Sequence, residues 1–356
     1  MRTLLRPTGF VDSPFGHDGK VARLAGALNW FSAVELITID GHRRTSTELV
    51  PVETIEDRLD DDMTAQWTAL TGQRAPLQLG ERTIRLDQPQ VMGILNVTPD
   101  SFSDGARFAD AGEAAAAGAD MAGQGAAIID VGGESTRPGA KPVWEGDEIE
   151  RVVPVVRQLV RGGTAVSIDT RKADVMTAAL EAGARLVNDV SALTYDERSA
   201  RVVAASGVPV VLMHHQGDPA TMQDDPRYDD VLVEVYLWLE QRIAAAEAAG
   251  IARDKILVDP GFGFGKNVGH NLELMNGLAL FHALGCPLVL GASRKRTIGA
   301  LSNEAPADQR LAGSLAFALK AAEQGAQIIR VHDVPETVQA LRVWRGLRDQ
   351  ALTPRA

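Results

Sequence analysis

The chain has 356 residues, of which 45% are hydrophobic, and its formal net charge is −11. This length accommodates one large core with a smaller appendage, and an acidic chain without a basic block argues against nucleic acid or an anionic membrane as the main partner. The single cysteine, Cys286, cannot form an intrachain disulfide, which favours a reducing, cytoplasmic setting. Pro7, Asp12 and Pro14 interrupt any apolar run near the start, so no signal peptide is expected, and no run approaches the roughly 20 apolar residues of a membrane span.

The first part of the chain, residues 1–85, does not share the rhythm of the rest. Residues 33–40 alternate weakly between apolar and polar side chains and predict a strand, and residues 63–70 predict a short helix. We expect an N-terminal extension of unknown role, followed by the main unit over residues 86–356.

From residue 91 onwards, apolar runs of strand length recur with a period of roughly thirty residues. The predicted strands cover residues 91–97, 127–132, 165–170, 185–190, 209–214, 256–260, 287–291 and 327–332. Helical segments are predicted between them, the clearest over residues 113–124, 147–160, 231–249, 308–324 and 335–347. Several of the helices are followed by a glycine suited to a left-handed C-cap, namely Gly125, Gly183, Gly207, Gly250 and Gly325.

Eight strands alternating with eight helices predict a (β/α)8 barrel, a TIM barrel of the α/β class. The rival is a doubly wound open sheet, which concentrates its site at one switch point. The barrel is favoured because polar residues end nearly every predicted strand, and a barrel gathers the ends of all eight strands at one mouth.

One group of strand-end residues suits a flat heterocycle. It consists of Asp169, Asn188, Asp259 and Lys295. Buried carboxylates and amides need partners, and a ring with a row of N–H donors and acceptors would supply them. The alternative is that these side chains form ion pairs among themselves.

A second group suits a phosphate. It consists of Asn96, Thr136, Arg137, Arg330 and His332. Arginine binds phosphate in a bidentate manner, and the last loops of a barrel commonly hold a phosphate. Asn96 could hold Mg²⁺ or orient the phosphate. The alternative for Arg330 is a surface ion pair, for instance with Asp333.

The glycine-rich run over residues 259–266 does not match the dinucleotide-binding pattern, and residues 267–270 are a poor helix start. Its two phenylalanines better suit an apolar wall for an aromatic co-substrate. His214 and His215 flank no metal-ligand set, so structural zinc is not expected, and His215 is expected to pack at a strand end. Cys286 is expected to be inert at the end of the barrel opposite the mouth.

Together these motifs resemble those of the dihydropteroate synthases, pterin-binding barrel enzymes of folate biosynthesis that sulfonamides inhibit. The matching segments are residues 93–105 (GILNVTPDSFSDG), 132–139 (GGESTRPG), 167–170 (SIDT), 188–190 (NDV), 212–214 (LMH), 259–266 (DPGFGFGK), 293–295 (SRK) and 330–333 (RVHD). The resemblance covers residues 91–333 in the family's order.

The resemblance implies a TIM-barrel transferase that condenses 6-hydroxymethyl-7,8-dihydropterin diphosphate with 4-aminobenzoate and releases pyrophosphate. It assigns the pterin to the first group above, and the diphosphate with Mg²⁺ to the second. It also assigns to the substrates Phe102, Pro138, Phe264 and Ser293, which would surround the aminobenzoate, and Met213. Asp104 would bind Mg²⁺ or accept the amine proton, and the residues nearest the chemistry would be Asn96, Asp104, Lys295, Arg330 and His332.

No strong base is evident beside a nucleophile, so we expect an SN1-like path in which the diphosphate leaves before the arylamine attacks. A homodimer is a further expectation from the family. Three rival functions remain open: folate methyl transfer to a corrinoid, a non-catalytic pterin-binding paralogue, and an unrelated phosphate-binding barrel enzyme. Arg330 and His332 argue against methyl transfer, which has no diphosphate to bind.

Overall fold

The computed structural model describes residues 1–97, 111–134, 142–217 and 222–353. Five candidate site residues lie outside these ranges, namely Phe102, Asp104, Thr136, Arg137 and Pro138.

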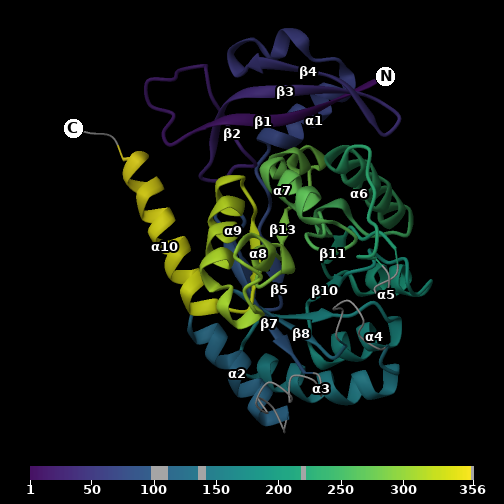
Figure 1. Ribbon diagram of the computed structural model, residues 1–356. Helices are drawn as coiled ribbons and strands as arrows, with labels where there is room; N and C mark the ends of the chain where they lie inside the picture. Colours follow the sequence, from purple (N-terminus) through teal and green to yellow (C-terminus); the bar gives the residue numbers. More distant parts are fainter. Residues whose placement is uncertain (98–110, 135–141, 218–221, 354–356) are drawn as a thin grey trace.

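Eight parallel strands form the central barrel (Figure 1). They are β7 (Gln90–Asn96), β8 (Ile128–Gly132), β9 (Val166–Asp169), β10 (Leu186–Asp189), β11 (Val210–Met213), β12 (Ile256–Asp259), β13 (Val289–Leu290) and β14 (Ile328–Val331). The strands pair in chain order, and β14 pairs with β7. The parallel bridge from Val258 to Leu288 closes the ring between β12 and β13. The predicted barrel is confirmed, and the open sheet is wrong.

At least one helix follows each of these strands. The helices are α2 (Ala111–Gly123), α3 (Glu145–Arg161), α4 (Ala173–Ala182), α5 (Ser199–Ser206), α6 (Val231–Ala248), α7 (Val268–Asn276), α8 (Arg296–Leu301), α9 (Leu311–Glu323) and α10 (Val334–Ala351). Short 3-10 helices are η1 (Val52–Thr54), η2 (Glu56–Arg58), η4 (Arg253–Lys255), η5 (Leu278–Leu284) and η6 (Ala307–Gln309). The five glycines expected near helix ends all have positive φ, and Gly183 and Gly207 are left-handed C-caps.

Helix α7 corrects one expectation, because residues 267–270 do begin a helix. Asn267 is the N-cap: its side chain accepts from the backbone N–H of His270, at 2.9 Å. His270 Nδ1 in turn accepts from the backbone N–H of Asn267, at 3.3 Å. The pair forms a capping box in which an imidazole takes the place usually filled by Glu or Gln.

The strands alternate between two faces, and this alternation positions the site. Side chains on the outward face, such as Ile129, Val187 and Val258, belong to the large core beneath the helices. Residues one position away point into the barrel and form a separate apolar cluster near the amino ends of the strands. This cluster includes Met92, Ile128, Leu186, Val211, Leu257 and Ile328. Two residues further along each strand, the same inward face reaches the mouth.

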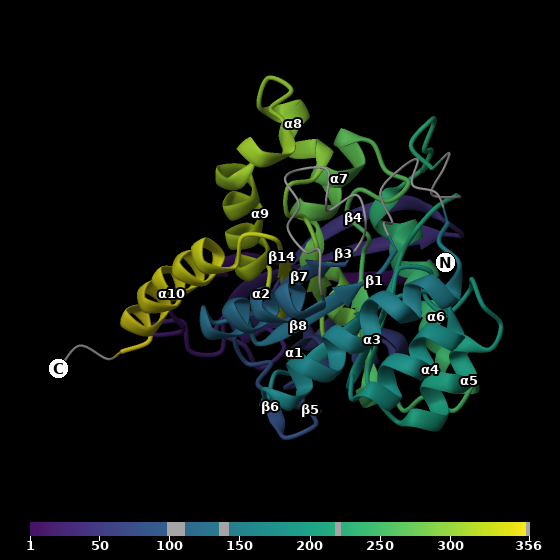
Figure 2. The same ribbon diagram turned by 90° about the horizontal axis from the view of Figure 1, so that it is seen from below.

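The hairpin of β5 (Leu77–Leu79) and β6 (Arg82–Ile84) covers the amino ends of the barrel strands. Leu77, Leu79 and Ile84 are buried in the same cluster as the strand residues above. In Figure 2 the hairpin lies at the lower end of the barrel and α8 at the upper end. The hairpin therefore closes the barrel floor, although it precedes the expected boundary at residue 85.

The remaining N-terminal residues form a separate antiparallel sheet and one helix. The elements are β1 (Arg2–Val11), β2 (Ala22–Arg23), β3 (Trp30–Asp40), β4 (Arg43–Pro51) and α1 (Asp61–Thr71), with β3 paired to the other three strands. The strand and helix expected in this segment are confirmed. Figure 1 shows the sheet (purple) beside α6 and α7. Asn29 Nδ2 donates to Ala322 O at the end of α9, at 2.9 Å, and Arg2 pairs with Glu240 on α6, at 2.6 Å.

Within the described ranges, no helix combines the length and the apolar character needed to cross a bilayer.

Candidate active site

The centre of the barrel mouth holds a chain of buried polar side chains from four strands. Arg330 on β14 donates from Nε to Asp130 on β8 and from an Nη to Asp169 on β9, each at 2.6 Å. Asn188 on β10 donates to the same carboxylate oxygen of Asp130, at 2.9 Å. Like the residues of the apolar cluster near the amino ends, all four point into the barrel from the inward face of their strands, which explains why they meet.

Arg330 therefore joins the two groups that the sequence treats separately. Asp333, the partner considered from the sequence, pairs with Arg294 instead. Burial would lower the pKa of the Arg330 guanidinium, but Asp130 and Asp169 outweigh burial and raise it. Burial also raises the pKa of Asp169, to about 7, although Arg330 acts in the opposite direction.

Asp130 and Asp169 each have one carboxylate oxygen that Arg330 and Asn188 do not contact. Oδ1 of Asp130 and Oδ1 of Asp169 are buried, and neither has a hydrogen-bond partner among the described residues. A buried acceptor of this kind costs free energy until a donor reaches it. Because Asp169 ends its strand at the mouth, its Oδ1 is suited to a ligand N–H group.

Asp259, at the end of β12, supplies a further buried carboxylate. Its Oδ1 accepts from the backbone N–H of Gly261, at 2.7 Å, and burial raises its pKa to about 6. The positive charges of Lys295 and Arg330 oppose this rise in the pKa of Asp259. Lys295 is the N-cap of α8, and its Nζ lies 4.0 Å from the centroid of the Phe264 ring.

Ser293 and His332 adjoin one another across β13 and β14. Ser293 Oγ lies 3.1 Å from His332 Nδ1 and accepts from the His332 backbone N–H, at 3.2 Å. Met213, at the end of β11, is buried with its side chain on the inward face. These positions agree with the strand-end placement expected for all three residues.

Asn96 ends β7 beside Gly132, and a methyl group at Gly132 would lie 3.7 Å from Asn96 Oδ1 and 3.5 Å from Asp169 Cβ. The amide oxygen of Asn96 and the Asp169 side chain thus lie close to the same backbone position. Within the described part of the chain, no three His, Cys, Asp or Glu side chains gather as a metal cage. Mg²⁺ shared with phosphates takes only one or two protein oxygens, and an amide oxygen such as that of Asn96 is among the ligands that this ion accepts.

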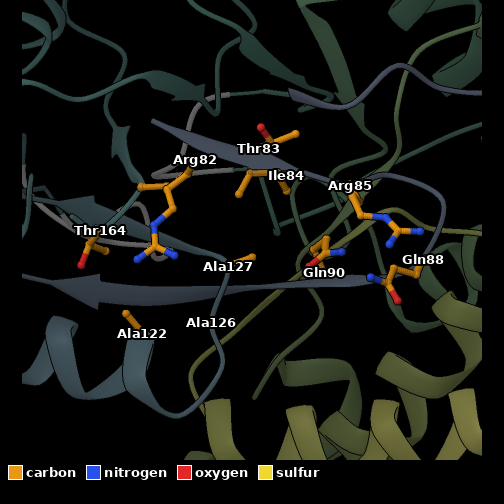
Figure 3. Close-up of a pocket in the computed structure, with 11 residues that line it drawn as sticks. Arg82, Thr83, Ile84, Arg85, Gln88, Gln90, Ala122, Ala126, Ala127 and Thr164 are labelled. Carbon is orange, nitrogen blue, oxygen red and sulfur yellow. The ribbon is translucent and has the colours of Figure 1, made fainter. Parts of the chain in front are cut away.

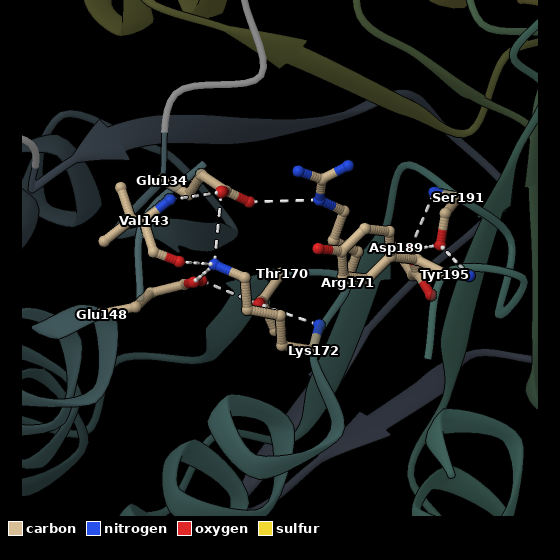
Figure 4. A network of polar contacts seen from close by, with 9 residues as sticks. All are labelled: Glu134, Val143, Glu148, Thr170, Arg171, Lys172, Asp189, Ser191 and Tyr195. Atoms are coloured by element: carbon tan, nitrogen blue, oxygen red, sulfur yellow. Dashed lines mark hydrogen bonds and ion pairs between the residues drawn. The ribbon is translucent and has the colours of Figure 1, made fainter. Parts of the chain in front are cut away.

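A second polar network lies beside the mouth, between β8 and β9 (Figure 4). Glu134 accepts from the Val143 backbone N–H, at 2.9 Å, and pairs with Arg171 and Lys172. Lys172 also donates to Glu148, at 2.6 Å. Burial alone would raise the pKa of Glu134, but these donors outweigh it and hold the pKa below the usual value. The network ties the chain on either side of residues 135–141 to the start of α4.

A cavity of about 290 Å³ lies at the opposite end of the barrel (Figure 3). Arg82, Arg85 and Gln88 line it, together with residues that precede β7 and β8. TIM-barrel chemistry takes place at the carboxyl ends of the strands, so this cavity is not the candidate active site.

Asp130 is the residue that the sequence reasoning missed. It lies inside a strand and not at its end, with a wholly buried side chain. The sequence does show an acidic residue within the otherwise apolar run of residues 127–132. It is two positions after Ile128, so both side chains point into the barrel. His215 packs its ring against Trp238, as expected, and Cys286 is buried, which raises the pKa of its thiol to about 11.

Comparison with known proteins bears on this site directly. Residues 92–332 match the family model described as pterin binding enzyme. The dihydropteroate synthase of Escherichia coli K12 is 51% identical over 262 residues, covering 73% of this chain and 92% of the relative. That of Neisseria meningitidis serogroup B is 47% identical over 276 residues, covering 76% and 96%.

Solved structures agree. The Yersinia pestis dihydropteroate synthase, in a sulfonamide drug complex, superposes with a TM-score of 0.74 at 48% identity, covering 77% of this chain and 99% of that one. The Xanthomonas albilineans enzyme with 4-aminobenzoic acid gives 0.73 at 47%, covering 79% and 100%. The same enzyme with 7,8-dihydropteroate gives 0.70 at 45%, covering 78% and 100%. The chain therefore belongs to the dihydropteroate synthase family of pterin-binding enzymes.

Proposed function

We propose that this protein condenses 6-hydroxymethyl-7,8-dihydropterin diphosphate with 4-aminobenzoate to give 7,8-dihydropteroate and pyrophosphate. The observation that carries the proposal is the buried Asp169 carboxylate, whose Oδ1 has no partner among the described residues and which lies opposite Asn188 on the neighbouring strand. Relatives solved with 4-aminobenzoic acid and with 7,8-dihydropteroate support the same substrates.

The pterin would occupy the centre of the mouth. Its ring N–H groups would donate to Asp169 and Asp259, while Asn188 can both donate and accept and Lys295 can serve a ring carbonyl or nitrogen. Asn188 already donates one N–H to Asp130, which holds its amide in one orientation. Both carboxylates are buried, so the N–H groups of a ligand would relieve part of the cost of that burial.

The diphosphate would lie against Arg330, His332 and Asn96. Ser293 Oγ contacts His332 at Nδ1 and orients its imidazole, which would lie against the leaving group. Thr136 and Arg137 would add contacts by the family's motif. Mg²⁺ bound at Asn96 would neutralise negative charge on the diphosphate.

An SN1-like path follows from this charge distribution. The C–O bond between the methylene carbon and the diphosphate breaks, and its electron pair leaves with pyrophosphate. Asp169 and Asp259 favour the cation that spreads over the dihydropterin ring. The lone pair of the arylamine then forms the C–N bond, and the amine proton passes to solvent or to Asp104. The alternative role for Asp104 is that of a Mg²⁺ ligand. Strong bond order to the incoming amine in the transition state, measured by a kinetic isotope effect, would contradict this order of steps.

The aminobenzoate would lie against Phe264, beside Lys295 and Ser293. By the family's motif Phe102 and Pro138 would complete its pocket, and Met213 would contact the pterin side. The start of α8 follows Lys295 directly, so helix N–H groups point towards the position assigned to the carboxylate. A sulfonamide that mimics 4-aminobenzoate would compete for this position.

The test is pyrophosphate release from the dihydropterin diphosphate with Mg²⁺, with and without 4-aminobenzoate. Release coupled to dihydropteroate formation supports the proposal, and Arg330→Ala should strongly reduce both. Pterin binding without release, by a folded protein, would favour a non-catalytic paralogue or folate methyl transfer and would contradict the proposed reaction.

We further propose a homodimer that works in the cytoplasm. Analytical ultracentrifugation at micromolar concentration tests the first expectation, and a single monomeric species would contradict it. Cell fractionation tests the second.

A further inference from the structure

The loop over residues 260–266, here called the Gly-Phe loop, connects β12 to α7 and carries Phe264. Its backbone lies hard against the end of β11. Gly261 has φ +68°, and a methyl group there would lie 1.7 Å from the carbonyl oxygen of His214. Gly265 has φ +64°, and a methyl group there would lie 2.4 Å from Gln216 O. Glycine lets the loop take this path but also leaves it conformationally free, so other groups must hold it.

Lys266 is the residue that holds the loop from within. Its side chain is buried, with 2% of the residue exposed. Its Nζ donates to Gly261 O and Phe264 O, each at 3.0 Å, and lies 2.8 Å from His214 Nδ1. An ammonium group has three N–H donors, and here each donor has one acceptor. Two acceptors lie in the loop itself and the third lies at the end of β11.

Asn271 on α7 holds the same loop from the other side. Its Oδ1 accepts from the Gly263 backbone N–H, at 2.7 Å, while Nδ2 donates to Asn267 O, at 2.8 Å. Nδ2 also lies 3.1 Å from Thr297 Oγ1, in the first turn of α8. The amide thus connects the Gly-Phe loop to the helix whose N-cap is Lys295.

The loop carries Phe264 and lies against Lys295, and both residues are assigned to the substrates. The Phe264 ring faces Lys295 Nζ at 4.0 Å, a distance at which a cation is attracted to the face of an aromatic ring. Gly263 lies against the Lys295 side chain, because a methyl group there would be 3.2 Å from its Cδ. Lys295 lies outside the loop, as the N-cap of α8, so a shift of the loop would move Phe264 while the backbone of Lys295 stays in place.

We propose that Lys266 is a positioning residue for the arylamine subsite, which acts by clamping the Gly-Phe loop so that Phe264 stays against Lys295. The inference rests on the proposed function, because it takes 4-aminobenzoate as the ligand beside Phe264. Neither the strand-end groups nor the expected mechanism gives Lys266 a role.

The charged and titratable groups around Lys266 bear on its charge state. Asp259 and Lys295 act on it from the mouth, His214 touches it from β11, and the ring of Tyr228 lies 6.0 Å away, with His270 on α7 beyond. Burial lowers the pKa of Lys266 to about 7, although Asp259 opposes this effect. Burial also lowers the pKa of His214 well below its usual value, so the imidazole is neutral and its Nδ1 accepts. Loss of the Lys266 proton would leave a lone pair facing one of three acceptors and would loosen the clamp.

The experiment compares the wild-type protein with Lys266→Met, which keeps the length of the side chain and removes all three donors. Lys255→Met is the matched control, because Lys255 directly precedes the same strand at its opposite end. For Lys266→Met we expect the KM for 4-aminobenzoate to rise roughly tenfold, with the KM for the dihydropterin diphosphate within twofold of wild type. The control should leave both constants unchanged.

The pH dependence of the wild-type protein supplies a second readout, which needs no folded variant. The KM for 4-aminobenzoate should rise as the pH increases through about 7, and in Lys266→Met it should be raised and flat over the same range. Equal effects on both KM values, a loss confined to kcat, or a wild-type KM that does not change between pH 6 and 8.5 would overturn the positioning role. A wild-type protein that releases no pyrophosphate would instead contradict the proposed function, and the inference would fail with it.

Discussion

Replacing Asp130 by asparagine tests whether the buried polar chain at the mouth controls Arg330. The substitution keeps the shape of the side chain and removes its charge. In the wild-type protein one oxygen of Asp130 accepts from both Arg330 and Asn188, at 2.6 and 2.9 Å. An asparagine that turns its oxygen to these donors loses the charge of the ion pair, and one that turns its amide to them sets donor against donor.

The structure bounds the size of the effect. Breaking a buried ion pair by removing one partner costs about 3–5 kcal/mol, because the remaining charge is left uncompensated. Here Asp169 still pairs with Arg330, so we expect a smaller loss of about 2–3 kcal/mol in the free energy of unfolding. Because Arg330 is expected to bind the diphosphate, we expect the same amount of about 2–3 kcal/mol to be lost from the transition state, which lowers kcat/KM about 30- to 160-fold.

Urea unfolding and the pyrophosphate release assay measure the two quantities on the same protein. Glu35→Gln is a suitable control, because Glu35 pairs with Arg6, at 2.8 Å, in the N-terminal sheet. The control should lower the free energy of unfolding by less than about 1 kcal/mol and leave kcat/KM unchanged. An Asp130→Asn protein with wild-type kcat/KM would refute the role of Asp130 in orienting Arg330.

Three further predictions concern titration and the N-terminal segment. The value of kcat/KM should fall as the pH drops below about 6–7. Burial raises the pKa of Asp169 to about 7 and that of Asp259 to about 6, and protonation removes the negative charge that favours the pterin cation. A pH–rate profile that stays flat down to pH 5 would contradict this. Asp259→Asn should abolish pterin binding yet increase the free energy of unfolding at pH 8, by at most about 3 kcal/mol. The sign follows because a carboxylate whose folded pKa lies above its unfolded value destabilises the fold as the pH rises through that interval; a less stable variant in urea unfolding would refute it. Asn29→Ala should lower the free energy of unfolding by about 1–3 kcal/mol and leave kcat unchanged, because it removes the hydrogen bonds to Ala322 O and Glu323 O. An unchanged midpoint in urea unfolding would show that this contact does not hold the N-terminal sheet.

The barrel was predictable from the sequence because its signal is local and repeated. Each strand is a short apolar run, and many of the runs end in or near a polar residue such as Asp169, Asn188 or Asp259. The period-2 alternation of a strand then forces those side chains to share a mouth, without any knowledge of the loops.

The N-terminal sheet was predictable only in part, because its pairings are long-range. Strand β1 contains Pro7 and Gly9, which weaken a strand pattern, and its partner β3 begins nineteen residues after β1 ends, counting from Val11 to Trp30. Strand β1 also packs against η5 and α1, and local patterning does not report such long-range contacts.

The role of Asp130 and the start of α7 were not predicted, for a similar reason. Asp130 is hidden inside a strand, so its role depends on which face of β8 points inward and on the presence of Arg330 across the barrel. The start of α7 depends on His270 as the second half of a capping box, a position where a carboxylate or carboxamide is the usual signal.

The most direct test of the account is a crystal structure of the protein with dihydropterin diphosphate and 4-aminobenzoate under conditions that prevent turnover. The account predicts that the pterin edge donates to Asp169 and Asp259, with Asn188 in hydrogen-bond contact and the arylamine ring against Phe264. A pterin bound instead at the amino ends of the strands, among Arg82, Arg85 and Gln88, would contradict it.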